Sequence, residues 1–255
     1  MSWNKKQIKQ HKQAAKALNK IRYETAEFIK SNPGVSDVAV RQFIKKQYKK
    51  YYLKSDKQKS IVAFGDDTSN VHYYAEQPRI LKKGDLIMID IWARLAEIGA
   101  PFADITWTLY YGGVGVQNIE PLPKKYADAF KMITQARDKA ISFIKSNLKK
   151  RIVPIGKAVD AVVRNYLEKH GHLEKFLHGT GHSLGLTSPH GTRTRINRKG
   201  RQPLPLNVGY TIEPGIYFKN KFGVRSEIDF YIQENYKLII TTICQKQIIK
   251  IWKKN

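Results

Sequence analysis

Cysteine is almost missing from this sequence, since Cys244 is the one example in 255 residues. A single thiol can form no internal disulfide and no cysteine-rich metal site. Long apolar runs are also missing: no stretch approaches the roughly 18 residues that span a bilayer, and no apolar signal segment follows the basic N-terminus. These absences predict a cytoplasmic protein without membrane association.

Acidic residues are scarce relative to basic ones, because 21 Asp and Glu face 46 Lys and Arg, for a net charge of +25. Such an excess is typical of proteins that bind polyanions. It is uneven, since residues 1–60 hold 16 basic and 4 acidic side chains. Solvated lysines of a lysine-rich composition give the same numbers. Two interpretations stay open: compositional bias, and a weak RNA or ribosome contact through the basic N-terminal region.

The order of helical and strand patterns repeats along the chain. Helical spacing covers residues 5–31, a second helix follows a Ser36 cap, and β-branched and aromatic segments fill residues 60–112. The second half repeats this order without a Gly, Ser or Pro-rich linker. We therefore predict one α+β domain, residues 1–255, made of two related halves. Its expected second-half helices are 123–148 and 156–170, and its strands are 61–64, 71–75, 86–93, 105–111, 211–218, 223–232, 237–243 and 247–252.

Four carboxylates lie in apolar or strand-like segments where a lone charge is costly. They are Asp90 in LIMIDIWA, Asp104 in FADITWT, Glu213 in YTIEPGIY and Glu227 in GVRSEIDF, and the glycine-rich segment HGTGHSLG adds His182. This oxygen-rich set suits Mn²⁺ or Co²⁺ and accepts Zn²⁺ or Fe²⁺. Because carboxylates can bridge two ions, the set predicts a two-metal hydrolytic site.

These five ordered residues, with the motifs IEPGIY, GVRSE and HGTGH, resemble the ligand set of the pita-bread metallopeptidases. That family, which has the creatinase/aminopeptidase fold, includes methionine aminopeptidase, proline-specific aminopeptidase, prolidase and creatinase. The motifs are most similar to the proline-peptidase branch, and the resemblance extends from about residue 10 to 235. It implies a pita-bread fold, with two pseudo-symmetric helix-helix-strand halves around a dinuclear metal site.

The resemblance also implies roles for the ligand residues. Asp90 is expected to bind one metal through both oxygens, while Asp104 and Glu227 bridge both metals. His182 and Glu213 are expected to complete the other metal site, with Glu213 also carrying a proton from water to the leaving amine. The implied cofactor is a pair of divalent ions, with Mn²⁺ first and Co²⁺, Zn²⁺ or Fe²⁺ as alternatives.

Four further residues match helper positions of the family. His72 in NVHYY matches a histidine on the approach to the site, and His190 in SPHG matches one that contacts the substrate carbonyl or the tetrahedral intermediate. His178 and Arg225 match residues that orient the ligands. The alternatives are a packed sheet position for His72 and a solvent-exposed loop for His190. Other acidic residues are expected in turns or on the surface: Asp66, Asp67, Asp85 and Asp229.

Several features depart from the family pattern. A chain of 255 residues has no room for the separate N-terminal domain usual in proline peptidases. His190 follows His182 by eight residues, Ser183 stands where glycine is common, and Trp107 stands where a basic residue is common. The arginine-rich loop 191–202 either attracts acidic substrates or a polyanion, or is a solvated turn. These departures affect the expected specificity more than the expected metal binding.

The sequence thus predicts a metal-dependent exopeptidase that hydrolyses N-terminal peptide bonds, with Xaa-Pro substrates first and methionine aminopeptidase as the alternative. A second alternative is a non-catalytic pita-bread module that binds RNA or the ribosome through its basic surface. The complete set of five ligands argues against this module. It also argues against creatinase-like hydrolysis of a carbon–nitrogen bond, which does not need all five.

Overall fold

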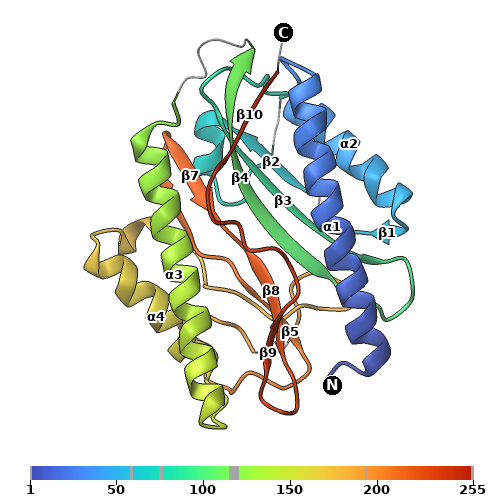
Figure 1. The fold of residues 1–255 in the computed structure, drawn as a ribbon, viewed down its shortest axis with the longest axis vertical. Coiled ribbons are helices and arrows are strands. Elements are labelled where there is room, and N and C mark those ends of the chain that lie inside the picture. The colour runs from blue at the N-terminus through green and yellow to red at the C-terminus, as the bar shows by residue number, and fades with distance from the viewer. Residues whose placement is uncertain (1, 58–59, 75–76, 115–120, 193, 254–255) are drawn as a thin grey trace.

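Helices flank a set of curved strands on two sides in the computed structural model of this chain (Figure 1). The structure describes residues 2–57, 60–74, 77–114, 121–192 and 194–253. In Figure 1 the first two helices lie on the right of the strands and the next two on the left. The α+β class and the two helix-helix-strand halves expected from the sequence are therefore confirmed.

Helices α1 (Lys5–Ser31) and α2 (Asp37–Lys50) begin at side chains that cap their free N–H groups. Asn4 and Gln7 form a reciprocal capping box at the start of α1. The Ser36 hydroxyl accepts a hydrogen bond from the backbone N–H of Ala39 at the start of α2. The apolar stripes of both helices pack on one face of the first sheet, where they form a continuous buried cluster.

The first sheet holds five strands in the order β1-β3-β4-β10, with β2 also paired to β3. Strands β3 and β4 form an unbroken antiparallel pair, whereas β10 runs parallel to β4. The expected strand at 247–252 thus belongs to the sheet of the first half. The strands are β1 (Leu53–Lys54), β2 (Ile61–Phe64), β3 (Leu86–Leu95), β4 (Ala103–Val114) and β10 (Ile249–Lys253), with a 3-10 turn η1 (Gly65–Ser69) after β2.

The strand expected at 71–75 is wrong, because Val71–Tyr74 form a turn and an irregular segment; Ala75 lies outside the described residues. Side chains hold this segment in place of a sheet partner. The Tyr73 hydroxyl donates to Asp37 at 3.0 Å, and the Val71 carbonyl accepts a 3.4 Å bond from Arg225. These contacts outweigh the strand propensity of its aromatic residues.

The second half contains two long helices and shorter strands. Each long strand expected at 211–218 and 223–232 is divided in two, so that β5 pairs with β8 and β6 with β7. The elements are α3 (Lys124–Lys149), α4 (Gly156–Lys169), the 3-10 turn η2 (Leu173–Lys175), β5 (Gly209–Ile212), β6 (Gly215–Phe218), β7 (Phe222–Arg225), β8 (Ile228–Ile232) and β9 (Leu238–Ile240).

Successive side chains of β3 point to opposite faces of the first sheet. One face packs against α1 and α2, and the other, which we call the inner face, points toward the second half. Ile87, Ile89 and Ile91 belong to the cluster under α1 and α2. Met88 and Trp92 belong to a separate small cluster, which includes Tyr217 from the second half. The side chain between them, at position 90, shares their face and therefore points toward the second half. No helix in the described part of the chain is both long and apolar enough to cross a membrane.

Candidate metal centre

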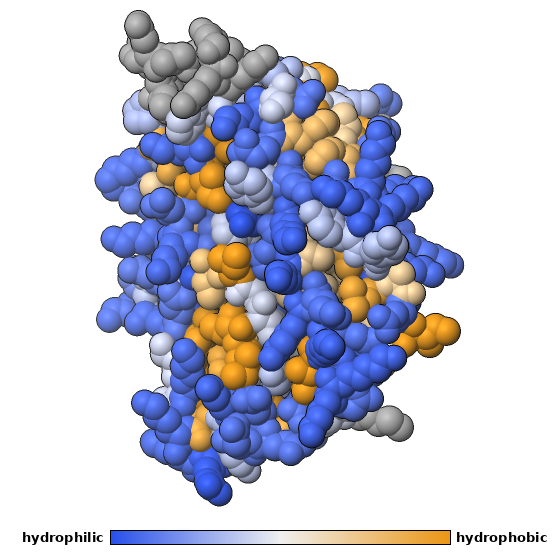
Figure 2. Space-filling view, turned by 45° about the vertical axis from the view of Figure 1, so that its right-hand side comes forward, coloured by the Kyte–Doolittle hydropathy of each residue, from blue (hydrophilic) through white to orange (hydrophobic). Residues whose placement is uncertain are grey.

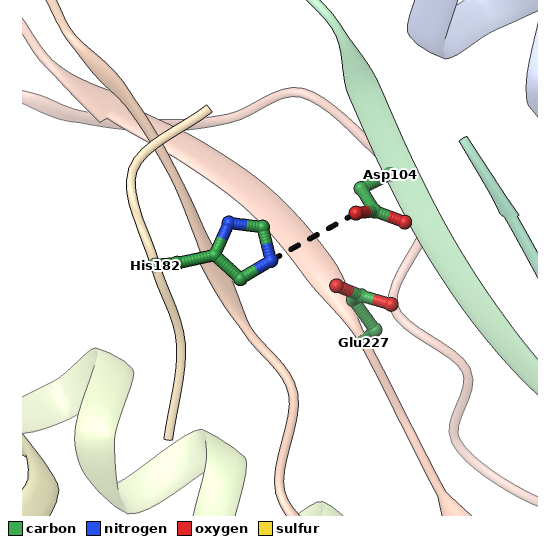
Figure 3. Close-up of side chains that lie close together, drawn as sticks. All are labelled: Asp104, His182 and Glu227. Carbon is green, nitrogen blue, oxygen red and sulfur yellow. Dashed lines mark ion pairs between the residues drawn. The ribbon is translucent and has the colours of Figure 1, made fainter. Parts of the chain in front are cut away.

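Three of the predicted ligands converge between the two halves of the molecule. Asp104 from β4, His182 from a loop and Glu227 from between β7 and β8 each offer one ligand atom, and these atoms all lie within 4.8 Å of one another. Figure 3 shows both carboxylates directed toward the edge of the imidazole. The distance from His182 Nε2 to Asp104 Oδ2 is 3.9 Å. His182 and Glu227 thus meet Asp104 although they follow it by 78 and 123 residues in the sequence.

The other two predicted ligands lie next to this group. Glu213 Oε1 is 3.3 Å from His182 Nε2. Asp90 is bound by the Arg225 guanidinium through Oδ2, while its Oδ1 is buried without a hydrogen-bond partner. Its charge contributes to the raised pKa values of both Glu213 and Glu227. The structure therefore places Glu213 against the imidazole and Asp90 behind the centre, where the arginine holds it.

Continuous pairing of β3 and β4 positions the two aspartates. Asp90 lies opposite Thr106, and Asp104 lies opposite Trp92. Directly opposed residues of an antiparallel pair project from the same face, as do residues two apart on a strand. Both carboxylates consequently leave the inner face of the sheet as a result of its regular geometry.

Interruptions in the strands position the two glutamates. Glu213 and Glu227 lie in two-residue gaps, between β5 and β6 and between β7 and β8, and the gaps oppose each other. The freed N–H of Glu213 donates to the Thr180 carbonyl at 2.8 Å, and that of Glu227 donates to the Thr106 carbonyl at 3.4 Å. Each gap thus connects a glutamate to a segment that carries another ligand.

A close backbone approach fixes the histidine loop. A Cβ atom on Gly181 would lie 2.1 Å from the carbonyl oxygen of Thr211, so only glycine fits there. The Thr211 hydroxyl accepts a 3.1 Å bond from the N–H of His182. Asp160, buried on α4, accepts bonds from the N–H and hydroxyl of Thr180 at 3.1 and 2.8 Å. Asp160 anchors this loop, and the sequence analysis missed it.

Each glutamate accepts a hydrogen bond from one threonine. The Thr106 hydroxyl donates to Glu227 Oε2 at 2.7 Å and accepts a 3.1 Å bond from Arg225 Nε. The Thr211 hydroxyl donates to Glu213 Oε1 at 3.0 Å. Such contacts orient carboxylates for a metal.

Burial controls the protonation of the centre. It raises the pKa of Asp104 and of Glu227 well above their ordinary ranges, and the neighbouring carboxylates raise both further. Burial also raises the pKa of Glu213 to about 7 and lowers that of His182 to about 4, which leaves the imidazole neutral and able to bind a metal.

The donor set fits a divalent cation. Asp90 Oδ1 and Asp104 Oδ1 are buried without hydrogen-bond partners. Orphaned carboxylate oxygens carry a desolvation cost that a cation removes. Oxygen donors with one neutral imidazole match the preferences of Mn²⁺, Co²⁺, Fe²⁺ and Zn²⁺.

His178 and Arg225 lie behind the ligands. The Tyr217 hydroxyl connects them, at 2.9 Å from His178 Nε2 and 3.2 Å from Arg225 Nη1. Burial, with a contribution from the arginine charge, lowers the pKa of His178 to about 3. A neutral ring therefore supports the arginine that holds Asp90, and the sequence analysis missed Tyr217 as their link.

His190 and His72 are the two predicted site residues that are exposed to solvent. The ring centroid of His190 is 4.3 Å from that of His182. Burial, together with the proximity of His182, lowers the pKa of His190. The N–H of His72 donates to the Asn70 side chain at 3.1 Å. Exposure of both imidazoles leaves them accessible to a substrate.

Asp229 is not a turn or surface residue, as the sequence had suggested, because it is fully buried in β8. Its Oδ2 accepts a 2.9 Å bond from the N–H of Asp104. Residues two apart on an extended chain share a side, so its spacing from Glu227 was the signal that could have revealed it. Asp66 and Asp67 do lie in a turn, where they pair with Arg79.

Arg137 on α3 is a second residue that the sequence analysis missed. Only 1% of this arginine is exposed, and its Nη1 donates to the Ser226 hydroxyl at 2.6 Å and to the Gln245 carbonyl at 2.8 Å. It thereby supports the strand break that contains Glu227. Its position four residues after Ile133 and four before Ile141, on the apolar face of α3, was the signal that could have revealed it.

Comparison with known proteins identifies the family. Residues 9–234 match the sequence model of Metallopeptidase family M24. The chain belongs to this family. The pita-bread resemblance expected from its motifs is confirmed, and the fold agrees with solved M24-like structures. One is the X-Pro aminopeptidase from Thermotoga maritima, with a TM-score of 0.80 and 26% identity, which covers 98% of this chain and 64% of that one.

A second similar structure is a dipeptidase from Pyrococcus horikoshii, with a TM-score of 0.82 and 26% identity over 98% of this M24 chain and 64% of that protein. Among curated relatives, the Xaa-Pro dipeptidase of Pyrococcus furiosus is 28% identical over 69% of this chain and 45% of its own length. Peptidase YqhT of Bacillus subtilis is 27% identical over 95% of this chain and 63% of its own length. The M24 chain therefore spans about half to two thirds of the length of these relatives.

Proposed function

We propose that residues 1–255 form the catalytic domain of a dinuclear-metal exopeptidase that hydrolyses the N-terminal peptide bond of Xaa-Pro peptides. The observation that carries this proposal is the convergence of Asp104, His182 and Glu227 to within 4.8 Å in an M24 chain, with Glu213 beside them. The similarity to an X-Pro aminopeptidase and to an Xaa-Pro dipeptidase supports the choice of substrate.

We propose that two divalent ions would be held by five residues: Asp90, Asp104, His182, Glu213 and Glu227. Mn²⁺ is our first choice, and Co²⁺, Zn²⁺ and Fe²⁺ are the alternatives. When bound, such ions supply Lewis acidity toward the scissile carbonyl and lower the pKa of water.

The side chains around the centre provide the proton transfer and the substrate contacts. Glu213 accepts a proton from the attacking water and delivers it to the leaving nitrogen. His190 donates a hydrogen bond to the scissile carbonyl oxygen, and His72 contacts the substrate as it enters. Arg225, backed by His178, keeps Asp90 oriented, since it binds one carboxylate oxygen and leaves the other free.

The test is to incubate the Mn²⁺-loaded protein with Xaa-Pro peptides and with matched Met-Ala peptides, and to measure the released N-terminal residue. Release from the Xaa-Pro set supports the proposal, and release from the Met-Ala set alone would assign the chain to methionine aminopeptidase activity. His182→Ala should abolish release and lower the metal content. If neither set is cleaved, the proposed activity is refuted.

The RNA or ribosome contact of the basic N-terminal region and the cytoplasmic location remain predictions from composition. A polyanion contact made by lysines requires affinity that falls steeply with salt. RNA binding with such a slope, measured on the full chain, would support the contact, and no binding at low salt would remove it.

A further inference from the structure

A basic groove lies between α2 and the segment that contains β1. We use this name for the cavity of about 540 Å³ whose walls include Arg41, Lys45, Lys49, Lys54 and Lys57. The cations come from one face of α2 and from the segment opposite it. The single acidic residue in its wall is Asp56, so the groove carries an excess of positive charge.

The positive charge of the basic groove is not neutralised locally. Across the described ranges of the chain, Lys45, Lys49, Lys54 and Lys57 form no ion pair with an acidic side chain. All four are exposed. Hydrophilic residues also dominate the face shown in Figure 2, where apolar ones form small separate patches. A ligand of this groove would therefore be selected by its negative charge.

The inner wall of the basic groove contacts the strand that carries Asp90. The Ser55 hydroxyl donates to the Trp92 carbonyl at 2.9 Å, and the Trp92 indole donates to Asp56 at 2.9 Å. Tyr48 lies 3.2 Å from the Ser60 hydroxyl, and Ser60 precedes β2, whose first residue is opposite Asp90. Burial raises the pKa of Tyr48, and the charges of Asp104 and Asp90 raise it further, which places its hydroxyl within electrostatic range of the centre.

Both loops that bear the exposed histidines adjoin the basic groove. The Arg41 guanidinium lies 5.5 Å from the ring centroid of Tyr74, two residues after His72. On the other side, the Ser188 hydroxyl is 3.5 Å from Asp56 Oδ2, and Ser188 is two residues before His190. The segments that carry His72 and His190 therefore border the groove, one at Arg41 and the other at Asp56.

We propose that the basic groove binds a carboxylate-bearing side chain of the peptide substrate, so that the enzyme prefers peptides with Asp or Glu near the cleaved bond. This inference rests on the proposed peptidase function. A cavity of about 540 Å³ that borders the loops of both exposed histidines matches a few peptide residues. A nucleic acid would instead need an extended row of phosphate contacts, such as the cations on α1 offer.

The experiment uses the Mn²⁺-loaded full chain and peptides of the form Xaa-Pro-Ala-Ala, with Glu placed at position 1, 3 or 4 and a matched Gln peptide for each. We expect kcat/KM to be about tenfold higher for at least one Glu peptide at low salt, because attraction between exposed charges is screened as salt rises. Lys45→Gln/Lys49→Gln should remove this preference and leave the Gln peptides unchanged.

The matched control is Lys9→Gln/Lys16→Gln, which removes the same charge from exposed positions of α1. It should keep the preference for Glu. Equal kcat/KM for every Glu and Gln pair would overturn the inference, and so would an equal loss for both peptides in the Lys45→Gln/Lys49→Gln protein. Thermal unfolding of both variants confirms that each is folded.

A binding measurement separates this inference from the proposed function. Dansyl-labelled Glu and Gln peptides are titrated with protein, and fluorescence anisotropy is read. Tighter binding of the Glu peptide that depends on Lys45 and Lys49, without cleavage of any peptide, would support the groove and refute the peptidase. Cleavage of the peptides together with equal binding of the Glu and Gln peptides would support the peptidase and refute the groove. Displacement of the Glu peptide by a short single-stranded RNA, at concentrations where poly-glutamate fails, would assign the groove to nucleic acid and overturn our proposal.

Discussion

The two halves of this molecule position the proposed metal ligands on hairpins of different construction. In the first half, β3 and β4 pair without interruption, and Asp90 and Asp104 project from the inner face through ordinary alternation. In the second half, the strands break at residues 213–214 and 226–227, and Glu213 and Glu227 lie inside the breaks.

The difference shows two ways to bring a buried carboxylate to a metal. In the continuous β3–β4 ladder the backbone N–H and carbonyl groups pair with each other. The register of that pairing therefore fixes the positions of the Asp90 and Asp104 carboxylates. A break frees N–H groups, and those of Glu213 and Glu227 bind the carbonyls of Thr180 and Thr106. The second hairpin is thereby tied to the histidine loop and to the first hairpin, which joins the two halves at the centre.

The largest effect is expected when a ligand is removed from either hairpin. Asp104→Asn and Glu227→Gln should each lower kcat by about 1000-fold or more, because they weaken binding of the metal that activates water. In chelator-treated protein both should raise Tm at pH 8, since they remove one of several buried carboxylates that raise one another's pKa.

Asp90→Asn is the contrasting variant, because it leaves the buried Arg225 without its anionic partner. It should destabilise the chelator-treated protein by about 3 kcal/mol, as breaking a buried ion pair does. Differential scanning fluorimetry of the three variants provides the comparison. Tm shifts of the same sign for all three would contradict the distinct roles assigned to Asp90 and the other two.

A second effect tests the contact between the histidine loop and the broken hairpin. Gly181→Ala places a Cβ atom 2.1 Å from a backbone oxygen, so the loop must move away from β5. We expect activity about 100-fold lower and a loss of about 1–3 kcal/mol in the free energy of unfolding, the usual cost of overpacking.

Gly99→Ala in the first half is the control. Gly99 has a φ of +75° but open space around it, so only backbone strain of about 1 kcal/mol applies. Activity should stay close to wild type. The close-approach argument fails if both alanine variants lose activity to the same extent in the release assay.

The third effect is the pH dependence of the free energy of unfolding in the metal-free protein. One buried group from each half contributes to it, and the two contributions have opposite signs. Burial lowers the pKa of His11 on α1 from 6.5 to about 4, so unfolding takes up a proton and stability falls as pH drops from 6.5 toward 4. Burial raises the pKa of Glu213 from 4.5 to about 7, so its contribution is full below 4.5 and is lost as pH rises to 7.

Each contribution has a slope of about 1.4 kcal/mol per pH unit, and between pH 4.5 and 6.5 the two slopes have opposite signs and offset each other. Urea unfolding in the presence of a chelator, repeated between pH 4 and 8, measures both. His11→Gln should leave a free energy of unfolding that falls as pH rises from 4.5 to 6.5, and Glu213→Gln should leave one that rises over the same range. An unchanged profile in either variant would show that the assigned group is not responsible.

The smallest effect concerns the threonines that donate to the glutamates. Thr106→Val removes the 2.7 Å bond to Glu227, and Thr211→Val removes the 3.0 Å bond to Glu213. Each should lower kcat/KM by about 10-fold to 100-fold through weaker metal binding, the usual cost of losing such a contact. Isothermal titration with Mn²⁺ measures the affinity directly. Thr134→Val, on α3 and away from the centre, should leave the affinity unchanged.

The sequence predicted the helices and the continuous hairpin well, because their signals are local. The Ser36 cap and the stop at residues 32–34 place the helix ends, and apolar segments around Asp90 and Asp104 mark two strands. The breaks were missed. Pro214 is a local signal for the first, since it lacks an N–H, but nothing at Ser226 announces the second.

Long-range contacts account for the other failures. Asp160 and Arg137 act through hydrogen bonds to residues 20 and 89 positions away. The pairing of β10 with β4 is likewise not encoded in either strand alone. Trp107, which stands where the family often has a basic residue, instead has the Arg22 guanidinium carbon 3.6 Å from the centroid of its ring. The positive charge beside position 107 of β4 therefore comes from α1.

The parallel pairing of β4 with β10 determines when the first sheet can be completed during protein synthesis. Roughly 135 residues separate Val114 from Ile249, and a ribosome needs on the order of 10 s to add them. Throughout this time the nascent chain exposes β4 as a free edge, which is open to pairing with other chains. Glu213 and Glu227 are also synthesised late in that interval, so the proposed metal centre can be completed only after nearly the whole domain has been translated.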